Sequence, residues 1–217
     1  ASVAVIGRSA DRAAIEIVER LGGSDAPLAC HDDERPPGRT RAFLKVQNGC
    51  DQHCSFCIIP RTRGVAESRP QAAILRDARR RLAEGHPELV LTGINIGTWR
   101  DGQGGDLADL VEQIAGLDGL RRLRISSIEP GDVDQRLVAT MARLPVVARH
   151  LHIPLQSADD GVLLSMGRSY DLDGYLQAIA WAREAMPEVN ITTDVIVGYP
   201  TEDAAAFELT YAVCEEL

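Results

Sequence analysis

Long hydrophobic runs, aromatic residues and cysteines are all scarce in this sequence. No apolar run approaches the ~18 residues that a transmembrane helix needs, and no charged-then-apolar leader opens the chain, so nothing indicates a membrane. Aromatic residues make up 4% of the 217 residues, hydrophobic residues 45% and charged residues 25%, which is ordinary for a globular domain. The net charge of −9 does not favour a polyanionic partner, although arginines gather locally, as at residues 79–81.

The five cysteines are distributed in a way that argues against a disulfide framework. Cys30 and Cys214 are isolated, which fits a reducing compartment, so we expect a cytoplasmic protein. Cys50, Cys54 and Cys57 are clustered, with three residues between the first two and two residues between the last two.

The clustered cysteines supply three thiolates, one fewer than the four that saturate a cubane iron–sulfur cluster. One iron would lack a protein ligand and would be open to a small molecule. A structural zinc site is an alternative, but it needs four ligands, and no second Cys/His pair lies at zinc-finger spacing. His53 could be the fourth ligand, although the chelate would be cramped inside the loop. The spacing therefore favours a cluster with three protein ligands.

From residue 42 onward, short apolar runs alternate with helical patterns, which is typical of βα units on a parallel sheet. The runs expected to form strands are 42–46, 89–94, 123–128, 151–155 and 191–197. The stretches expected to form helices are 71–83, 107–114, 133–142, 172–185 and 204–216. Five units are too few for a closed eight-stranded barrel of ~250 residues. We expect an α/β fold, an open partial barrel with its site at the carboxyl ends of the strands.

Residues 1–40 differ in sequence pattern from the rest of the chain. Residues 2–7 predict a strand, residues 11–21 predict a helix, and the Pro-Pro-Gly stretch at 36–38 predicts a linker. Both ends of the chain look cut. We therefore expect a remnant of an N-terminal α/β domain, followed by a core at 41–217.

Two apolar patterns predict which side chains pack in the interior. One side of the helix at 172–185 carries apolar residues at helical spacing, which predicts a stripe packed on the sheet. Its members are Leu172, Leu176, Ile179 and Met186. After the fifth strand, Val195 and Val197 are expected to fill the barrel interior.

Polar residues and glycines follow the predicted strands. Gly93 would let a backbone approach a ligand and Asn95 offers a donor and an acceptor, although both also suit an ordinary turn. Glu129 could accept hydrogen bonds from a ribose diol or an ammonium group, or could be a favourable charge at a helix N-terminus. Gln156 and Ser157 end the fourth strand and are further candidates for a binding site.

The fourth and fifth strands carry a histidine pair and a glycine. His150 and His152 alternate onto one face, which could suggest a metal pair. No carboxylate or cysteine lies at matching spacing, so hydrogen-bonded structural roles are favoured. Gly198 would permit a tight turn beneath a ligand.

Several of these segments together resemble the methylthiotransferase branch of the radical S-adenosylmethionine (SAM) superfamily. The segments that carry the resemblance are Gln47-Asn48-Gly49-Cys50, Cys57-Ile58-Ile59-Pro60, Arg63-Gly64, Ser68-Arg69, Leu155-Gln156-Ser157, Met166-Gly167-Arg168 and Asp194-Val195-Ile196-Val197-Gly198-Tyr199-Pro200. Residues 91–97 and 126–130 look most like the enzymes that modify threonylcarbamoyl-adenosine in tRNA.

The resemblance implies a set of cofactors and contacts. Cys50, Cys54 and Cys57 would hold a [4Fe–4S] cluster, with SAM chelating the open iron and an aromatic residue, here Phe56, against its adenine. The residues expected to contact SAM follow different strands and would converge on one rim of a parallel sheet; they are Phe56, Gly93, Asn95, Glu129, Gln156, Ser157, Arg168 and Gly198. Arg168 could instead be exposed to solvent or paired with an acid. No catalytic residue is assigned.

The resemblance also implies a reaction and its partners. A methylthio group would be placed on C2 of the adenosine next to the anticodon, whose strong C2–H bond calls for a radical rather than acid–base chemistry. The substrate would be a tRNA anticodon stem-loop, with unpaired bases that suit recognition by stacking. Flavodoxin or ferredoxin would donate electrons.

The chain departs from the family in what it lacks. Family members carry an N-terminal domain with three further cysteines for a second cluster, of which residues 1–40 resemble only the tail. A sixth strand and a C-terminal RNA-binding domain are also missing. We therefore expect a fragment that binds cluster and SAM but does not complete sulfur insertion. Two alternatives stay open, a single-cluster radical SAM enzyme of other specificity and a non-catalytic, metal-stabilised binding module.

Overall fold

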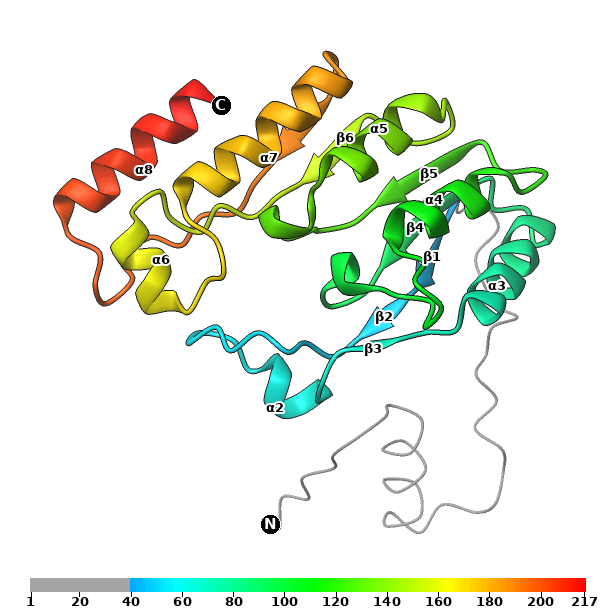
Figure 1. Ribbon diagram of the computed structural model, residues 1–217, viewed down its shortest axis with the longest axis horizontal. Coiled ribbons are helices and arrows are strands. Elements are labelled where there is room, and N and C mark those ends of the chain that lie inside the picture. Colours follow the sequence, from blue (N-terminus) through cyan, green and yellow to red (C-terminus); the bar gives the residue numbers. More distant parts are fainter. Residues whose placement is uncertain (1–39) are drawn as a thin grey trace, which may run out of the picture.

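The computed structural model describes residues 40–217. The strand, helix, linker and domain remnant expected in residues 1–39 lie outside the described residues. Within residues 40–217, five parallel strands follow one another in chain order around an arc, with helices on its outer side (Figure 1). This is the open partial barrel that the alternation of apolar runs and helical patterns predicts.

The parallel strands form two ladders joined by single bridges. β1 (Arg41–Lys45), β4 (Glu88–Thr92) and β5 (Arg122–Ile125) form a three-stranded sheet, and β6 (His150–His152) pairs with β7 (Asn190–Thr192). Bridges between Leu123 and Val147 and between Ser127 and His152 connect the two ladders. A bridge between Gln156 and Val195 continues the second ladder beyond its strands. The carboxyl ends of all five strands therefore meet at one edge.

A helix follows each parallel strand and covers the outer face of the arc. The helices are α3 (Gln71–Ala83), α4 (Leu107–Ala115), α5 (Gln135–Arg143), α7 (Leu172–Ala185) and α8 (Ala204–Glu216). Aspartates cap four of them, because a carboxylate accepts hydrogen bonds from the free amides of the first turn. These aspartates are Asp106, Asp134, Asp171 and Asp203. In residues 40–217, no helix has the length and apolar character needed to cross a bilayer.

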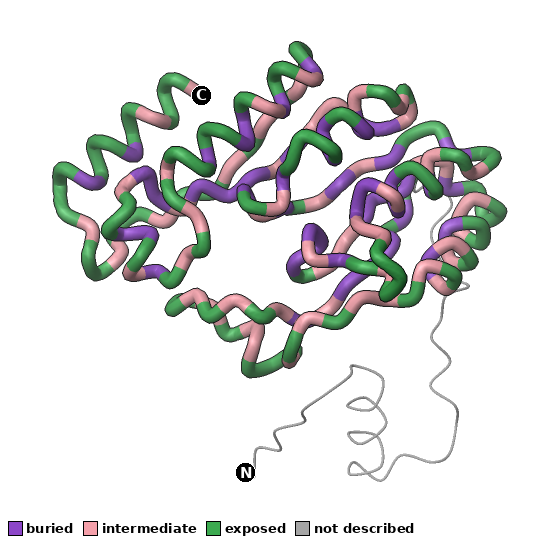
Figure 2. The backbone as a smooth tube through the Cα atoms, in the orientation of Figure 1, coloured by how far each residue is buried: buried purple, intermediate pink, exposed green. Residues whose placement is uncertain are grey.

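The core lies between the outer face of the strands and the helices. On β1, Ala42 and Leu44 are buried against α3, whereas Phe43 on the opposite face is 66% exposed. This alternation follows from the two-residue period of a strand. Buried positions run along the strands and the inner sides of the helices, while the loop at 50–57 has none (Figure 2).

Two of the expected apolar patterns are wrong in detail. The buried stripe of α7 is formed by Tyr175, Ala178, Ile179 and Ala182, continued by Met186. Leu176 lies one helical step, about 100°, from Tyr175 and is 38% exposed.

The segment after β7 also differs from expectation. The strand ends at Thr192, and Val195 and Val197 are 37% and 63% exposed instead of filling the interior. Among the described residues, no strand pairs with the far side of β7, which is therefore the edge of the second ladder.

Several short elements were not expected from the sequence. The antiparallel pair β2 (Gln47–Asn48) and β3 (Glu67–Ser68) closes the base of the cysteine loop, which also contains α2 (Ile59–Arg63). The helix α6 (Asp160–Met166) follows β6, and 3-10 turns occupy η1 (Ile96–Thr98) and η2 (Pro130–Asp132). These elements are too short for a periodic signal, and all of them lie near the strand ends.

Gly49 allows the two sides of the loop base to meet. Its φ is 68°, and a Cβ at this residue would lie 1.9 Å from the carbonyl oxygen of Val65. Gly85 has a similar φ of 87°, but nothing lies within 4 Å of the position of its Cβ. The two glycines therefore share the left-handed backbone and differ in the space around them.

We predict that Gly49→Ala destabilises the protein more than Gly85→Ala. Both substitutions place a side chain on a left-handed residue, which costs about 1–2 kcal/mol. Gly49→Ala adds a steric overlap that costs about 1–3 kcal/mol more. Urea unfolding of the two variants measures the difference, and equal losses would contradict the described closure of the loop.

Candidate functional site

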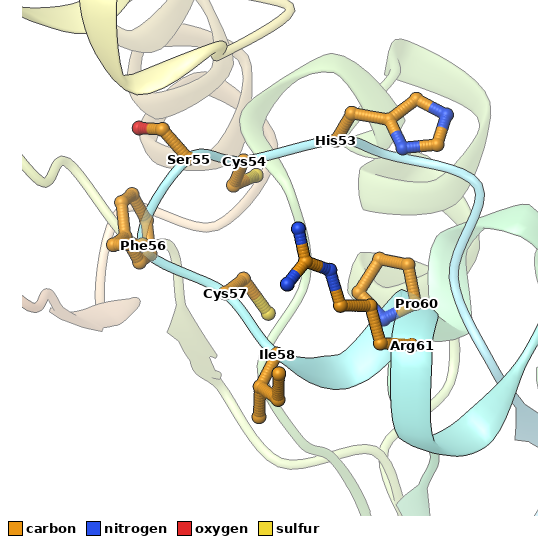
Figure 3. A pocket seen from close by; sticks show the side chains of 8 residues that line it. All are labelled: His53, Cys54, Ser55, Phe56, Cys57, Ile58, Pro60 and Arg61. Atoms are coloured by element: carbon orange, nitrogen blue, oxygen red, sulfur yellow. The ribbon is translucent and has the colours of Figure 1, made fainter.

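The cysteine loop surrounds a hollow of about 330 Å³. Cys54, Phe56, Cys57 and Arg61 are among the side chains that line it, and Arg61 extends toward the two cysteines (Figure 3). Cys50 begins the loop, where its sulfur accepts a hydrogen bond from the Gln52 amide at 3.4 Å. The loop therefore surrounds an open hollow, with the Cys54 and Cys57 thiols in its wall and the Cys50 thiol where the loop begins.

The three loop thiols are free and lie within electrostatic reach of one another. Burial raises the pKa of the Cys50 thiol, the Gln52 amide opposes this effect, and the charges of Cys54, Glu129 and Cys57 raise the pKa further. Among residues 40–217, no three His, Cys, Asp or Glu side chains converge closely enough for a single metal ion. A single zinc ion needs all its ligands on one atom, whereas a cubane cluster takes its thiolates at separate irons.

Arg168 places a positive charge against the thiols. Its guanidinium donates a hydrogen bond to the Cys54 sulfur at 3.1 Å and forms an ion pair with Glu129. The Arg168 side chain is only 5% exposed and lies 4.9 Å from the centroid of the Tyr170 ring. Of the alternatives for Arg168, solvent exposure is wrong and pairing with an acid is confirmed. A cation next to the thiolates is a suitable environment for an anionic cluster.

Tyr170 extends this contact to the segment that follows β6. Its single hydroxyl hydrogen is shared between the carbonyl oxygens of Pro154 and Leu155, each 2.9 Å from the hydroxyl oxygen. Burial raises the pKa of Tyr170 to about 12, although the Arg168 charge opposes that shift. The phenol therefore stays protonated at neutral pH and remains a donor.

The end of α6 holds the tip of the loop. The Ser55 amide donates to the Met166 carbonyl at 2.9 Å, and a Cβ on Gly167, whose φ is 72°, would lie 3.0 Å from the His53 oxygen. The Ser55 and Tyr199 hydroxyls are hydrogen-bonded at 2.6 Å. The segments 166–168 and 198–200, which carry part of the family resemblance, thus position the cysteine loop.

Six of the eight residues expected to contact SAM lie in three groups. The bond between Ser55 and Tyr199 brings Phe56 and Gly198, their sequence neighbours, to the same side of the domain. Arg168 contacts both Glu129 and Cys54. Phe56 is 43% exposed and lines the hollow, so its ring is accessible to a ligand.

The turn after β4 forms the third group. Asn95 is 5% exposed, and its Oδ1 atom is buried with no hydrogen-bond partner among the described residues. A Cβ on Gly93 would lie 2.7 Å from the Ile96 side chain and 3.0 Å from the Gln47 carbonyl oxygen. Gly93 therefore makes room for neighbouring protein atoms, and Asn95 presents an unused acceptor.

The candidate residues that follow β6 and β7 have distinct roles. Gln156 has a φ of 65°, which no other non-glycine residue shares in the described part of the chain. Such strain is typical of functional sites. Ser157 is fully buried. Its hydroxyl accepts a hydrogen bond from the Asp159 amide and contacts the Thr210 hydroxyl, so it stabilises the turn that follows β6 from the protein interior. Gly198 has a φ of 76°, as the expected tight turn requires.

The two histidines take part in a hydrogen-bonded chain on the inner face of the sheet. His150 contacts Arg124 at 3.2 Å and Thr192 at 3.3 Å, and His152 contacts Thr192 at 2.9 Å and Asp194 at 3.2 Å. Burial and the neighbouring Arg124 lower the pKa of His150. The expected hydrogen-bonded roles are confirmed.

A family model described as the radical SAM superfamily matches residues 44–214. The chain belongs to the radical SAM superfamily. Solved radical SAM proteins have the same fold. TsrM from Kitasatospora setae, bound to tryptophan and a SAM analogue, gives a TM-score of 0.67 at 16% identity, covering 82% of this chain and 34% of that one. The Escherichia coli coproporphyrinogen III oxidase HemN gives 0.58 at 18% identity, covering 84% of this chain and 43% of that one.

Curated relatives are more similar in sequence. The chain is 40% identical to the tRNA-2-methylthio-N(6)-dimethylallyladenosine synthase of Cereibacter sphaeroides over 79% of this chain and 39% of that protein. It is 39% identical to the protein of the same name from Citrifermentans bemidjiense, over 85% of this chain and 42% of that protein. The chain thus spans about two-fifths of the length of these relatives.

In this radical SAM chain, each of the three loop cysteines should be required for the cluster. Because the loop offers no spare thiol, Cys50→Ala, Cys54→Ala or Cys57→Ala should each abolish stable assembly, which normally takes about four irons per chain. The exposed Cys214 provides the control, and Cys214→Ala should keep full iron content. Iron and sulfide analysis after anaerobic reconstitution measures this, and a full cluster in Cys54→Ala would defeat the assignment.

A double-mutant cycle should show that Arg168 and Glu129 are coupled in the metal-free protein. Arg168→Met leaves the half-buried Glu129 carboxylate without its partner, and Glu129→Gln leaves the buried guanidinium without its anion. We expect a coupling free energy of about 1–3 kcal/mol, so the double variant should be more stable than the summed single losses imply. Additive losses in urea unfolding would show that the ion pair does not stabilise the loop.

Proposed function

We propose that this chain is the radical SAM core of a tRNA methylthiotransferase. The observation that carries the proposal is its 39–40% identity to relatives named as methylthio-adenosine synthases, over most of the chain. The loop with its three free thiols, backed by Arg168, supports the same proposal. The reaction would place a methylthio group on C2 of an adenosine next to the anticodon.

Different residues at the carboxyl ends of the strands would bind the cluster and SAM. Cys50, Cys54 and Cys57 would hold a [4Fe–4S] cluster, which when bound supplies the electron that cleaves the SAM sulfonium. The Arg168 guanidinium, which donates a hydrogen bond to the Cys54 sulfur, would place a positive charge beside the anionic cluster. The exposed Phe56 ring offers a stacking surface for adenine.

Other rim residues would orient SAM by hydrogen bonding. The Oδ1 atom of Asn95 is an unused acceptor, and a ligand donor there would satisfy a buried polar atom. Gln156 and Gly198 contribute strand-end backbone in left-handed conformations. Ser157 is left out of the proposed contacts, because its hydroxyl is already engaged inside the protein.

For the nucleoside, we propose threonylcarbamoyl-adenosine. The support is the resemblance of residues 91–97 and 126–130 to enzymes of that specificity. These two segments lead into turns that pack directly on each other, since a Cβ on Gly97 would lie 2.2 Å from the Asp132 Cβ. Dimethylallyl-adenosine is the second candidate, favoured by the names of the relatives.

The proposed activity implies further components. The sulfur would come from a second cluster in a longer protein, electrons would come from flavodoxin or ferredoxin, and the cytoplasm would be the site of action. The tRNA anticodon stem-loop would be the substrate. A single-cluster enzyme of other specificity and a metal-stabilised binding module are the competing functions.

Nucleoside analysis separates the two tRNA substrates. Disrupting the gene that encodes this chain should remove the methylthio derivative of threonylcarbamoyl-adenosine from cellular tRNA and leave its unmodified parent in place. Mass spectrometry of digested tRNA detects both. Loss of the methylthio-dimethylallyl nucleoside instead would assign the second candidate, and an unchanged nucleoside profile would refute the tRNA proposal.

The reconstituted chain itself should cleave SAM slowly. With a strong reductant, it should release 5′-deoxyadenosine and methionine, and Cys57→Ala should release neither. Chromatography of the products measures the yield. One tightly bound zinc per chain, no visible absorbance and no cleavage would favour the binding module.

A further inference from the structure

Gln47 is a fully buried polar residue at the base of the cysteine loop, where β2 begins. Its side-chain Nε2 donates to the carbonyl oxygens of Asn48 and Gly49, at 2.8 Å each. Its Oε1 accepts from the amides of Ile94 at 3.0 Å and Asn95 at 2.9 Å. An amide has two donors and two good acceptor positions, so every hydrogen-bonding capacity of the Gln47 side chain is used.

The bonds of Gln47 join two segments that are far apart in the sequence. One segment is the root of the cysteine loop, ending at Cys50, and the other is the turn at 93–95. The segments are packed closely, since a Cβ on Gly93 would lie 3.0 Å from the Gln47 carbonyl oxygen and 3.1 Å from its Cβ. Gln47 therefore contacts both segments, and a side chain larger than glycine at residue 93 would overlap with it.

The two ends of the Gln47 amide bind two segments with different proposed roles, one in cluster binding and one in SAM binding. Its donor end fixes the peptide before Cys50, the first ligand of the proposed cluster. Its acceptor end fixes the backbone of Asn95, whose Oδ1 atom is buried and has no partner among the described residues. The distance between the first cluster ligand and this unused acceptor is therefore set through Gln47.

We propose that Gln47 is a positioning residue that aligns Cys50 with the Asn95 turn for SAM binding. The proposal rests on the proposed binding of cluster and SAM, and it adds a residue that itself touches neither. Only glutamine supplies both halves of the contact at this length. Asparagine is one methylene shorter, glutamate would turn two donors into an oxygen facing two carbonyls, and methionine keeps the length without hydrogen bonds.

Two variants separate the halves of the contact. Gln47→Met removes all four hydrogen bonds, whereas Gln47→Glu keeps an acceptor for the Ile94 and Asn95 amides and loses the donors to the loop root. Thr210→Val is the matched control. It also replaces a buried polar side chain by an apolar one, and it breaks bonds to the Ala158 amide at 2.9 Å and the Ala206 carbonyl at 3.0 Å.

The first measurement is amide hydrogen exchange by NMR in the metal-free chain, which needs no cofactor. In Gln47→Met, protection of the Ile94 and Asn95 amides should fall about tenfold or more, because each loses its acceptor. In Gln47→Glu, these two amides should keep their protection. Unchanged protection in Gln47→Met would overturn the proposed role of Gln47.

The second measurement is SAM binding to the anaerobically reconstituted chain, followed by the electron paramagnetic resonance spectrum of the reduced cluster. Both Gln47 variants should keep near-full iron content and raise the Kd of SAM about tenfold or more, while Thr210→Val stays within about twofold. A wild-type Kd in Gln47→Met, despite lowered stability, would reduce Gln47 to a structural residue and overturn the proposal. If wild-type protein loads iron but binds no SAM, the proposed function fails, and hydrogen exchange still decides whether Gln47 joins the two segments.

Discussion

The contact of the Arg168 guanidinium with Cys54 and Glu129 is the interaction on which the site depends. It joins the cysteine loop to the segment after β5 and to the end of α6, which are distant in the sequence. A buried guanidinium is costly to desolvate, so its position is favourable only where anions surround it. Cluster thiolates would provide further negative charge, and we expect the contact to strengthen on loading.

The parallel sheet makes this arrangement possible. Because the strands run in one direction, their carboxyl ends present loops to a common rim. The loops at this rim are held by side chains from other loops, such as Tyr199 on Ser55 and Gln47 on Asn95. The fold supplies the rim, and long-range hydrogen bonds fix the loops on it.

Much of the fold can be predicted from the sequence, because helices and buried strands have periodic patterns. The bounds of α3, α7 and α8 agree with the predicted stretches, and the cysteine spacing identifies the loop. Leu176 shows the limit of such patterns. It lies one helical position from the buried stripe, and the sequence alone does not distinguish it from the buried apolar residues. Val195 and Val197 show another, since apolar character alone does not say what covers a side chain.

The supporting residues of the site could not be predicted in the same way. Gln47 and Tyr199 act through hydrogen bonds to residues more than 40 positions away, and such bonds leave no local pattern. Ser157 was expected at the rim because it follows a strand, but its hydroxyl lies against α8. A strand end gives a residue's place along the edge and does not give the direction of its side chain.

We propose that the three-cysteine loop holds a cluster with one iron left open for SAM. Mössbauer spectroscopy of protein reconstituted with isotopically enriched iron, with and without SAM, distinguishes this iron from the other three. We expect four irons, of which three thiolate-bound sites stay unchanged and one site increases its isomer shift when SAM binds. A spectrum of mononuclear iron, or a cluster spectrum that SAM leaves unchanged, would contradict it.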